Sequence, residues 1–272
     1  MITIIIPTLN AQDTIKECLE SVKEYPVIII DKFDKAKYGL TIKDYCDDYD
    51  NVIYYRQKGS GIADARNQAL EHVKTPYVMM LGSDNELYNF RWTLTRTNKL
   101  EDAITYMESE KWAGLGFLTR VKSFKTYWDD AMDYWFFKKI KMGECKVIGT
   151  PNIFKTEILK KYMYDDKCKF CDDSDLGERM AKDGYKVGYG SFYALDIQRN
   201  NYKVIKKRWQ MYAKSDIQYH NKYKKQWGLL RRLKSYLHSL TADWMGWNLY
   251  YLPFWILIAF IRFTGRFCLK GD

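Results

Sequence analysis

Four apolar, strand-like runs in this chain are each followed by residues suited to binding a phosphate-bearing ligand. In chain order these residues are Pro7 and Thr8, Asp31, Gly59 to Gly61, and Asp84. Carboxylate oxygens are ligands that Mg²⁺ and Mn²⁺ prefer, commonly together with substrate phosphates. A ligand with a diphosphate leaving group needs such a cation, because negative charge develops on the diphosphate as the diphosphate departs. The residue types therefore indicate a divalent-cation site in which acids such as Asp84 are candidate ligands.

The elements that must position these residues alternate between strand-like and helical patterns. Short apolar runs begin at Ile2, Val27, Asn51 and Tyr77, as is typical of buried parallel strands. Helical patterns lie between them, the first with Asn10 as its expected cap. This order predicts an α/β fold, a parallel sheet with helices on both faces. Ligands bind such sheets at the carboxyl ends of the strands, where the residues above lie.

The second part of the chain continues the mixed pattern. We expect a helix beginning at Asn98, a strand and three further helices, at 98–110, 113–119, 125–140, 154–162 and 175–182. Two common nucleotide-binding signatures are missing from the sequence. The turn after the first strand reads PTLNAQ rather than GxGxxG, so NAD binding is not expected, and the sequence contains no GxxxxGK[ST] P-loop.

Five segments resemble glycosyltransferase family 2, whose members have the GT-A fold. The segments are IIIPTLN at 4–10, IIIDKFD at 28–34, GSGIADARNQAL at 59–70, YVMMLGSDNEL at 77–87 and CDDSDLGERMAKDGYKVGY at 171–189. Each is weak alone, but five in this order and spacing are specific. The resemblance implies a Rossmann-like, mostly parallel sheet flanked by helices. It places the catalytic domain at 1–200, with a nucleotide-sugar half at about 1–90 and an acceptor half at about 91–200.

The resemblance also implies a role for each matching position. The residues expected to bind the nucleotide sugar are Pro7, Thr8, Asp31, Gly59, Gly61, Arg66, Ser83 and Asp84. Thr8 and Asp31 would contact the nucleoside, and Arg66 would help to shape the diphosphate pocket. Asp84 matches the last acid of the D-x-D motif, which binds Mn²⁺ or Mg²⁺. Asp173 matches the catalytic base, which deprotonates the acceptor hydroxyl in an inverting displacement.

Three positions depart from the family pattern. Gly82 replaces the first acid of D-x-D, Lys32 replaces a second acid after Asp31, and Asp172 replaces the Glu of the E-D pair. These departures leave open a catalytically degenerate protein that binds nucleotide sugars as a scaffold. Simpler structural roles also stay open, such as a turn residue for Asp84 and a salt-bridge partner for Arg66.

The net charge of +10 is concentrated in one region. Residues 199–234 contain twelve Lys and Arg and one acid, Asp216, which gives +11, so the rest of the 272-residue chain sums to about −1. Such a stretch suits an anionic membrane surface, an anionic substrate or nucleic acid, or forms a solvated helical face. With no recognised nucleic-acid module, a nucleic-acid partner is not expected.

Residues 201–272 are expected to form an appendage of basic helices and an apolar region. The stretch WMGWNLYYLPFWILIAFI at 244–261 is uncharged and aromatic, and it is borderline in length for a membrane span. We expect an interfacial or re-entrant helical pair. The alternative is an apolar helix packed on the catalytic domain or on a partner subunit.

These features together predict an inverting, metal-dependent glycosyltransferase that uses a nucleoside-diphosphate sugar, UDP-linked. Its acceptor would be a hydroxyl, a lipid phosphate or a lipid-linked glycan. The start MITIIIPTLN has no basic region typical of a signal peptide, so we expect a cytoplasmic protein at the inner face of the cell membrane. The sequence does not name the sugar, the linkage or the oligomeric state.

Overall fold

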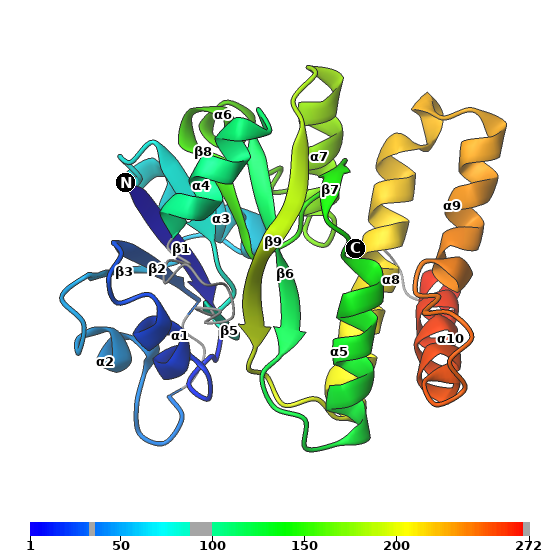
Figure 1. Ribbon diagram of the computed structural model, residues 1–272, viewed down its shortest axis with the longest axis horizontal. Coiled ribbons are helices and arrows are strands. Elements are labelled where there is room, and N and C mark those ends of the chain that lie inside the picture. Colours follow the sequence, from blue (N-terminus) through cyan, green and yellow to red (C-terminus); the bar gives the residue numbers. More distant parts are fainter. Residues whose placement is uncertain (33–35, 88–99, 269–272) are drawn as a thin grey trace.

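The computed structural model describes residues 1–32, 36–87 and 100–268 of the chain (Figure 1). Its strands are β1 Ile2–Thr8, β2 Val27–Asp31, β3 Val52–Arg56, β4 Tyr77–Met80, β5 Asn85–Leu87, β6 Gly114–Val121, β7 Gly143–Cys145, β8 Asn152–Lys155 and β9 Val187–Asp196. Its α-helices are α1 Ile15–Ser21, α2 Ile42–Cys46, α3 Ile62–His72, α4 Leu100–Ser109, α5 Tyr127–Lys139, α6 Thr156–Tyr162, α7 Asp172–Lys182, α8 Tyr202–Tyr223, α9 Leu229–Thr241 and α10 Leu252–Cys268.

The described strands form one mixed sheet in the order β3-β2-β1-β4-β8-β6-β9-β5, with β7 paired to β9. Strands β1 to β4 run parallel to one another, as do β6 and β9. Strand β8 runs antiparallel to both of its neighbours, β4 and β6. The prediction of an α/β fold with a mostly parallel sheet and flanking helices is confirmed, and the antiparallel β8 joins the two parallel parts.

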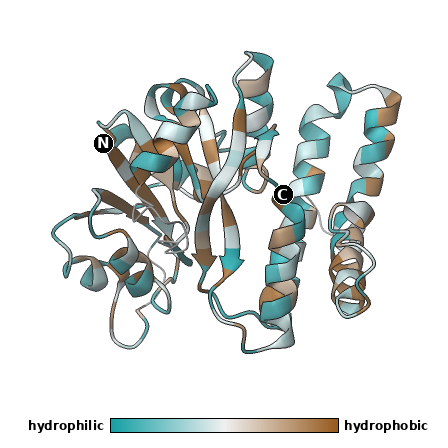
Figure 2. Cartoon of the chain, in the orientation of Figure 1, coloured by the Kyte–Doolittle hydropathy of each residue, from teal (hydrophilic) through white to brown (hydrophobic). Residues whose placement is uncertain are grey.

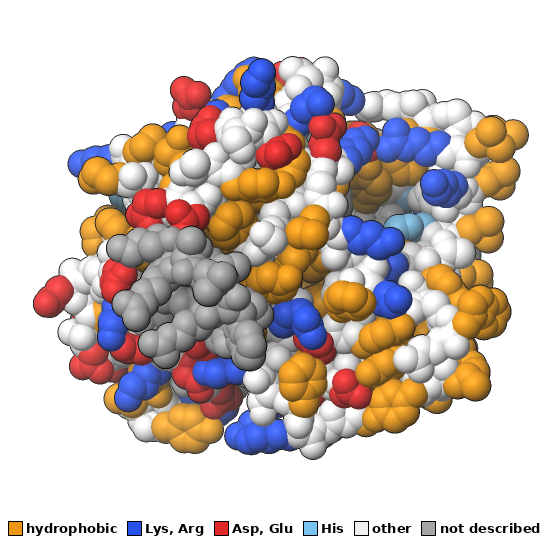
Figure 3. Space-filling model, in the orientation of Figure 1, with side chains coloured by type: hydrophobic (Ala, Val, Ile, Leu, Met, Phe, Trp, Pro, Cys, Tyr) orange, Lys and Arg blue, Asp and Glu red, His pale blue; other side chains and the backbone are white. Residues whose placement is uncertain are grey.

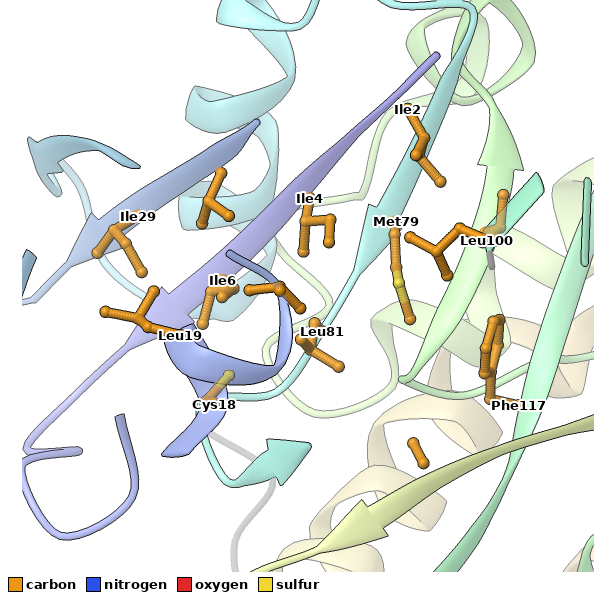
Figure 4. Packing of buried hydrophobic residues seen from close by; sticks show 14 of the residues in the cluster. Ile2, Ile4, Ile6, Cys18, Leu19, Ile29, Met79, Leu81, Leu100 and Phe117 are labelled. Atoms are coloured by element: carbon orange, nitrogen blue, oxygen red, sulfur yellow. The ribbon is translucent and has the colours of Figure 1, made fainter. Parts of the chain in front are cut away.

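Alternation along β1 supplies both faces of the sheet with apolar side chains, because successive residues of a strand point to opposite faces. Ile4 and Ile6 pack with Leu19 of α1, whereas Ile5 packs with Leu70 of α3 on the other face. Figure 4 shows the first of these clusters, in which Met79 of β4 lies beside the β1 residues. The hydropathy colouring in Figure 2 marks the strands of the sheet as among the most hydrophobic parts of the fold.

Three expected element boundaries differ from the structure. Asn10 has φ 54° and does not cap a helix, since α1 begins at Ile15 after a turn. The expected helix 154–162 begins instead at Thr156, because residues 152–155 form the central strand β8. Helix α7 starts at Asp172, earlier than expected, and the expected cap Asn98 lies outside the described residues.

Helices α5, α8 and α10 share a third apolar cluster that contains Trp135, Trp209, Phe254 and Ile258. The carboxylate of Asp243 accepts hydrogen bonds within this cluster from the indoles of Trp135 and Trp209, at 3.1 and 2.9 Å. Part of the stretch 244–261 thus packs as core. It contains the start of one helix, α10, and not the expected helical pair. Among the described residues we find no helix that combines the length and apolarity needed to cross a membrane.

Candidate active site

The carboxyl ends of β1 and β2 bring Thr8 and Asp31 together, as expected for neighbouring parallel strands. The two residues are partners in the strand register, and the Thr8 hydroxyl donates to Asp31 Oδ1 at 2.7 Å. The Tyr54 hydroxyl of β3 donates to the other carboxylate oxygen at 3.0 Å. Asp31 is 1% exposed, so its carboxylate is fixed by the protein at the edge of the sheet.

The glycine turn before α3 has a conformation that favours glycine at position 61 and leaves little space at position 59. Gly61 has φ +89°, a backbone angle that residues with a side chain rarely adopt. A Cβ on Gly59 would lie 2.4 Å from Oδ1 of Asp64. The ammonium of Lys32, which stands where the family has an acid, donates to the Gly59 carbonyl at 2.8 Å. Lys32 therefore links the end of β2 to this turn by a hydrogen bond.

A cavity of about 570 Å³ lies at the carboxyl edge of the sheet, within the size range of ligand pockets. Its walls come from β1, β4, α3, β6, α5, β9 and α8. Among the predicted site residues, Pro7, Arg66 and Asp84 line it. The other predicted residues (Thr8, Asp31, Gly59, Gly61, Ser83 and Asp173) are not among its lining residues.

Two carboxylates line this cavity, Asp84 after β4 and Asp196 at the end of β9. Their segments are joined where β5 pairs with β9, and the amide of Ile197 donates to the Asp84 carbonyl at 2.9 Å. Burial and the neighbouring Asp84 carboxylate raise the pKa of Asp196 to about 6, although Arg208 acts in the opposite direction. Asp196 was missed from the sequence. The signal was a strand-like run, VGYGSFYAL, that ends on an acid as VIII does at Asp31.

The geometry around Gly82 accounts for the missing first acid of the D-x-D motif. A Cβ on Gly82 would lie 2.6 Å from Oδ1 of Asn85 and 2.7 Å from Oδ1 of Asp84. Such distances are far below ordinary contact, so a side chain at position 82 would displace both groups. The carboxylate of Asp84 occupies space that an acid at position 82 would need.

Residues Asp172 and Asp173, at the start of α7, are held by the guanidinium of Arg66 from α3. Arg66 Nη1 forms ion pairs with Asp172 and, at 3.0 Å, with Asp173, while its Nη2 donates to the Thr150 hydroxyl at 2.6 Å. The Arg66 side chain is 4% exposed and also lies over the Tyr164 ring. Arg66 therefore has the salt-bridge role that the sequence left open as an alternative. Because Arg66 also lines the cavity, its role in shaping the diphosphate pocket stays a prediction.

The ionisation of Asp173 suits a general base. Burial and the adjacent Asp172 raise the pKa of Asp173 to about 6, although Arg66 favours the charged form. The side chain remains 28% exposed. A carboxylate with this pKa is ionised at neutral pH and accepts a proton more readily than an ordinary aspartate.

Part of the basic stretch 199–234 faces the cavity. Lys207 and Arg208 of α8 line its wall. Arg208 Nη2 lies 3.2 Å from Asp196 Oδ2 and 3.1 Å from Gln198 Oε1. These cations line the same cavity as the carboxylates, so the lining combines groups suited to a cation with groups suited to phosphate oxygens.

A divalent cation fits this donor set. Asp84, in the turn between β4 and β5, and Asp196, at the end of β9, provide two carboxylates in one cavity. Burial, with the nearby Asp84 carboxylate as a smaller cause, raises the pKa of Asp196. One or two carboxylates plus substrate phosphates are a usual Mg²⁺ or Mn²⁺ environment. A sheet of this kind, with acids and cations at its carboxyl edge, is the arrangement that the resemblance to GT-A transferases predicts.

The chain belongs to glycosyl transferase family 2, whose family profile matches residues 3–142. A teichoic acid poly(glycerol phosphate) polymerase of Staphylococcus epidermidis is 34% identical over 117 residues, which are 40% of this chain and 16% of that protein. The chain thus corresponds to a small part of that polymerase. An uncharacterised glycosyltransferase of Methanocaldococcus jannaschii is 24% identical over 248 residues, covering 83% of this chain and 81% of the relative.

Solved structures confirm the GT-A fold. The mannosyltransferase PcManGT of Pyrobaculum calidifontis, in complex with GDP-Man and Mn²⁺, matches with a TM-score of 0.61 at 15% identity, covering 100% of this chain and 76% of that one. S. aureus TarS residues 1–349, in complex with UDP-GlcNAc, matches with a TM-score of 0.52 at 16% identity, covering 94% and 79%. The prediction of a glycosyltransferase is confirmed at the level of family and fold.

Proposed function

We propose that this protein is an inverting glycosyltransferase that moves a sugar from a nucleoside-diphosphate sugar to an acceptor hydroxyl. The observation that carries the proposal is the cavity that Asp84 and Asp196 line together with Lys207 and Arg208. The UDP-GlcNAc complex of TarS supports a UDP-linked donor. The GDP-Man complex of PcManGT makes GDP-linked sugars the necessary comparison.

Asp84 and Asp196 would hold a Mn²⁺ or Mg²⁺ ion at the diphosphate. When bound, the cation supplies positive charge to the departing diphosphate. Arg208 and Lys207 would add fixed positive charge to the cavity lining, where they would balance charge that builds up on the phosphate oxygens. Pro7, Thr8, Asp31 and the glycine turn would position the nucleoside and diphosphate at the strand ends.

Asp173 would accept the proton of the acceptor hydroxyl. The acceptor oxygen then bonds to the anomeric carbon as the bond from that carbon to the diphosphate oxygen breaks, and the nucleoside diphosphate leaves. Attack and departure take place on opposite faces of the sugar, so the configuration inverts. Arg66 would hold the Asp173 carboxylate in place and line the cavity beside it.

The acceptor would be a lipid phosphate or lipid-linked glycan at the inner face of the membrane. The relative named as a teichoic acid polymerase supports an acceptor that belongs to a cell-envelope polymer. The missing first acid of the D-x-D motif, where Gly82 stands, motivates a scaffold protein as the alternative, one that binds nucleotide sugars without turnover.

Donor hydrolysis in the absence of acceptor tests the proposal. UDP-Glc, UDP-GlcNAc, UDP-Gal and GDP-Man are incubated with the protein and Mn²⁺ or Mg²⁺, and the released nucleotide is quantified. We expect turnover of one donor and its loss in Asp84→Asn, but not in the matched control Glu86→Gln on the same segment. A wild-type protein that binds UDP yet hydrolyses none of these donors with either metal establishes the scaffold alternative.

A further inference from the structure

Helix α9 presents an apolar face that the rest of the described chain leaves uncovered. Its large hydrophobic side chains are exposed to the following extents: Leu229 72%, Leu230 82%, Leu233 51%, Tyr236 50%, Leu237 58% and Leu240 38%. Successive residues of an α-helix are about 100° apart around its axis, so these six side chains share one stripe. None of the side chains described on α9 is buried.

The exposed apolar surface continues from α9 onto the loop before α10 and onto α10 itself. Trp247 and Leu249 in the loop are 85% and 77% exposed, and Ile256 and Phe260 on α10 are 53% and 64% exposed. The opposite side of α10 packs into the core through Phe254 and Ile258. Figure 3 shows hydrophobic side chains with Lys and Arg among them along the edge of the molecule formed by α9 and α10.

The charges on this part of the chain have one sign at the surface. Between Ile217 and Cys268 the sequence has eight Lys and Arg but a single acid, Asp243. Of these eight cations, Arg262 and Arg266 are buried, and Lys222 and Arg231 form ion pairs with acids outside this stretch. Asp243 is 1% exposed and bound by two indoles and by Arg262. At about 100° per residue, Arg232 and Lys234 fall on either side of the leucine stripe of α9.

We propose that the outer face of α9, the Trp247–Leu249 loop and α10 docks onto an anionic lipid bilayer. Leucines and aromatics would enter the boundary between headgroups and acyl chains, and the flanking Arg232 and Lys234 would contact anionic headgroups. Apolar helical faces bordered by Lys and Arg bind membrane interfaces in this way, without spanning the bilayer.

A second copy of this chain fits the same surface less well. A two-fold dimer places the same patch on both partners, so the cations of one copy would face the cations of the other without an exposed acid of this stretch to balance them. An anionic bilayer supplies that opposite charge. The inference rests on the proposed function in one respect: docking on a bilayer would bring the active site to a lipid-linked acceptor.

Vesicle flotation tests the docking. The full-length protein is mixed with vesicles of phosphatidylcholine alone or with 30% phosphatidylglycerol, and the floated fraction is measured. We expect at least tenfold stronger binding to the anionic vesicles, lost in Leu230→Glu/Leu237→Glu. The matched control is Phe124→Glu/Met142→Glu, whose parent residues are 56% and 65% exposed elsewhere, and it should float like wild type. Arg232→Gln/Lys234→Gln should lower anionic binding about tenfold.

Two further measurements separate the possible failures. Donor hydrolysis without vesicles reports the catalytic site alone. Hydrolysis without flotation overturns the docking proposal and keeps the proposed glycosyltransferase activity. Flotation without hydrolysis overturns the proposed activity and keeps the docking proposal. Light scattering reports self-association. A wild-type dimer that Leu230→Glu/Leu237→Glu converts to a monomer, with no flotation, assigns the surface to a second copy. Equal flotation of the α9 variant and wild type also overturns the proposal.

Discussion

The Nη1 atom of Arg66 lies 3.0 Å from Oδ1 of Asp173 and also contacts Asp172. Arg66 comes from α3, in the half of the sheet expected to bind the nucleotide sugar, and both acids come from α7, in the half expected to bind the acceptor. One buried guanidinium thus joins the two halves and orients the candidate base. This one guanidinium pairs with two acids, so replacing Arg66 should lower both the stability and the activity of the protein.

Replacing Arg66 by Met should destabilise the protein by about 3–5 kcal/mol, because it leaves Asp172 and Asp173 without their buried partner. Urea unfolding measures this change. Arg66→Met/Asp172→Asn should recover part of the loss, since one of the unbalanced acids is removed. Lys74→Met, at an exposed position, is the control and should change stability by no more than about 0.5 kcal/mol. An Arg66→Met protein as stable as wild type would show that the ion pairs contribute nothing.

Replacing Asp173 by Asn should lower kcat by about 10²–10⁴, the usual contribution of a general base. In the wild type, kcat/KM should fall as the pH drops below about 6, where Asp173 becomes protonated. The folded pKa lies above the ordinary value of 3.8, so the folded state binds this proton more tightly than the unfolded chain. The free energy of unfolding should therefore decrease as the pH rises from about 4 to 6.

The Asn variant lacks this titration, so at pH 7.5 it should melt no lower than the wild type while remaining inactive. Thermal melts and rate measurements across pH 4–8 provide both readings. Asp183→Asn, on an exposed acid at the other end of α7, is the control for the rate. A large loss of melting temperature in Asp173→Asn would instead indicate that the residue serves mainly in folding.

Restoring the family acid by Gly82→Asp should impair the protein. A Cβ at this position would lie 2.6–2.7 Å from the side-chain oxygens of Asn85 and Asp84, and crowding of this kind costs about 1–3 kcal/mol. Calorimetry should show weaker Mn²⁺ binding, because the Asp84 carboxylate is displaced. Gly82→Ala separates the steric effect from the added charge and should share most of it. Tighter Mn²⁺ binding in Gly82→Asp would mean that the Asp84 side chain moves aside at little cost.

The part of the fold formed by β1 to β4 was predictable because its sequence signals are local. The runs at 2–6, 27–30, 51–55 and 77–81 are continuous and apolar, and each ends at the sheet edge on the residues predicted to act there.

The errors and omissions depend on tertiary contacts. Residues 152–155 have a composition compatible with a helix, and only pairing with β4 and β6 makes them a strand. Asp196 follows Asp84 by more than a hundred residues, so their meeting is set by the pairing of β5 with β9. The burial of one side of α10 depends likewise on contacts with the indoles of α5 and α8. No local sequence pattern predicts these contacts.

Replacing Asp243 by Ala should loosen the C-terminal helices. The Asp243 carboxylate accepts from Trp209 Nε1 at 2.9 Å and from Arg262 Nη1 at 3.0 Å, and Trp209 is fully buried. Removing the carboxylate leaves the Trp209 indole without this acceptor and Arg262 with Asp216 as its remaining acid partner, which costs about 1–3 kcal/mol. The exposed pair Glu144 and Lys186 provides the control, since Glu144→Ala should cost less than about 1 kcal/mol.

Urea unfolding and limited proteolysis within 224–268 measure the effect. Because α10 is held against α8 and α5 through this carboxylate, cleavage should accelerate in the C-terminal helices of Asp243→Ala while the sheet stays resistant. Equal cleavage rates in Asp243→Ala and Glu144→Ala would show that apolar packing of Phe254 and Ile258 alone secures α10. The expected result follows from the burial. Asp243 is 1% exposed, and its removal leaves the indoles of Trp135 and Trp209 without this acceptor, while Arg262 keeps its ion pair with Asp216.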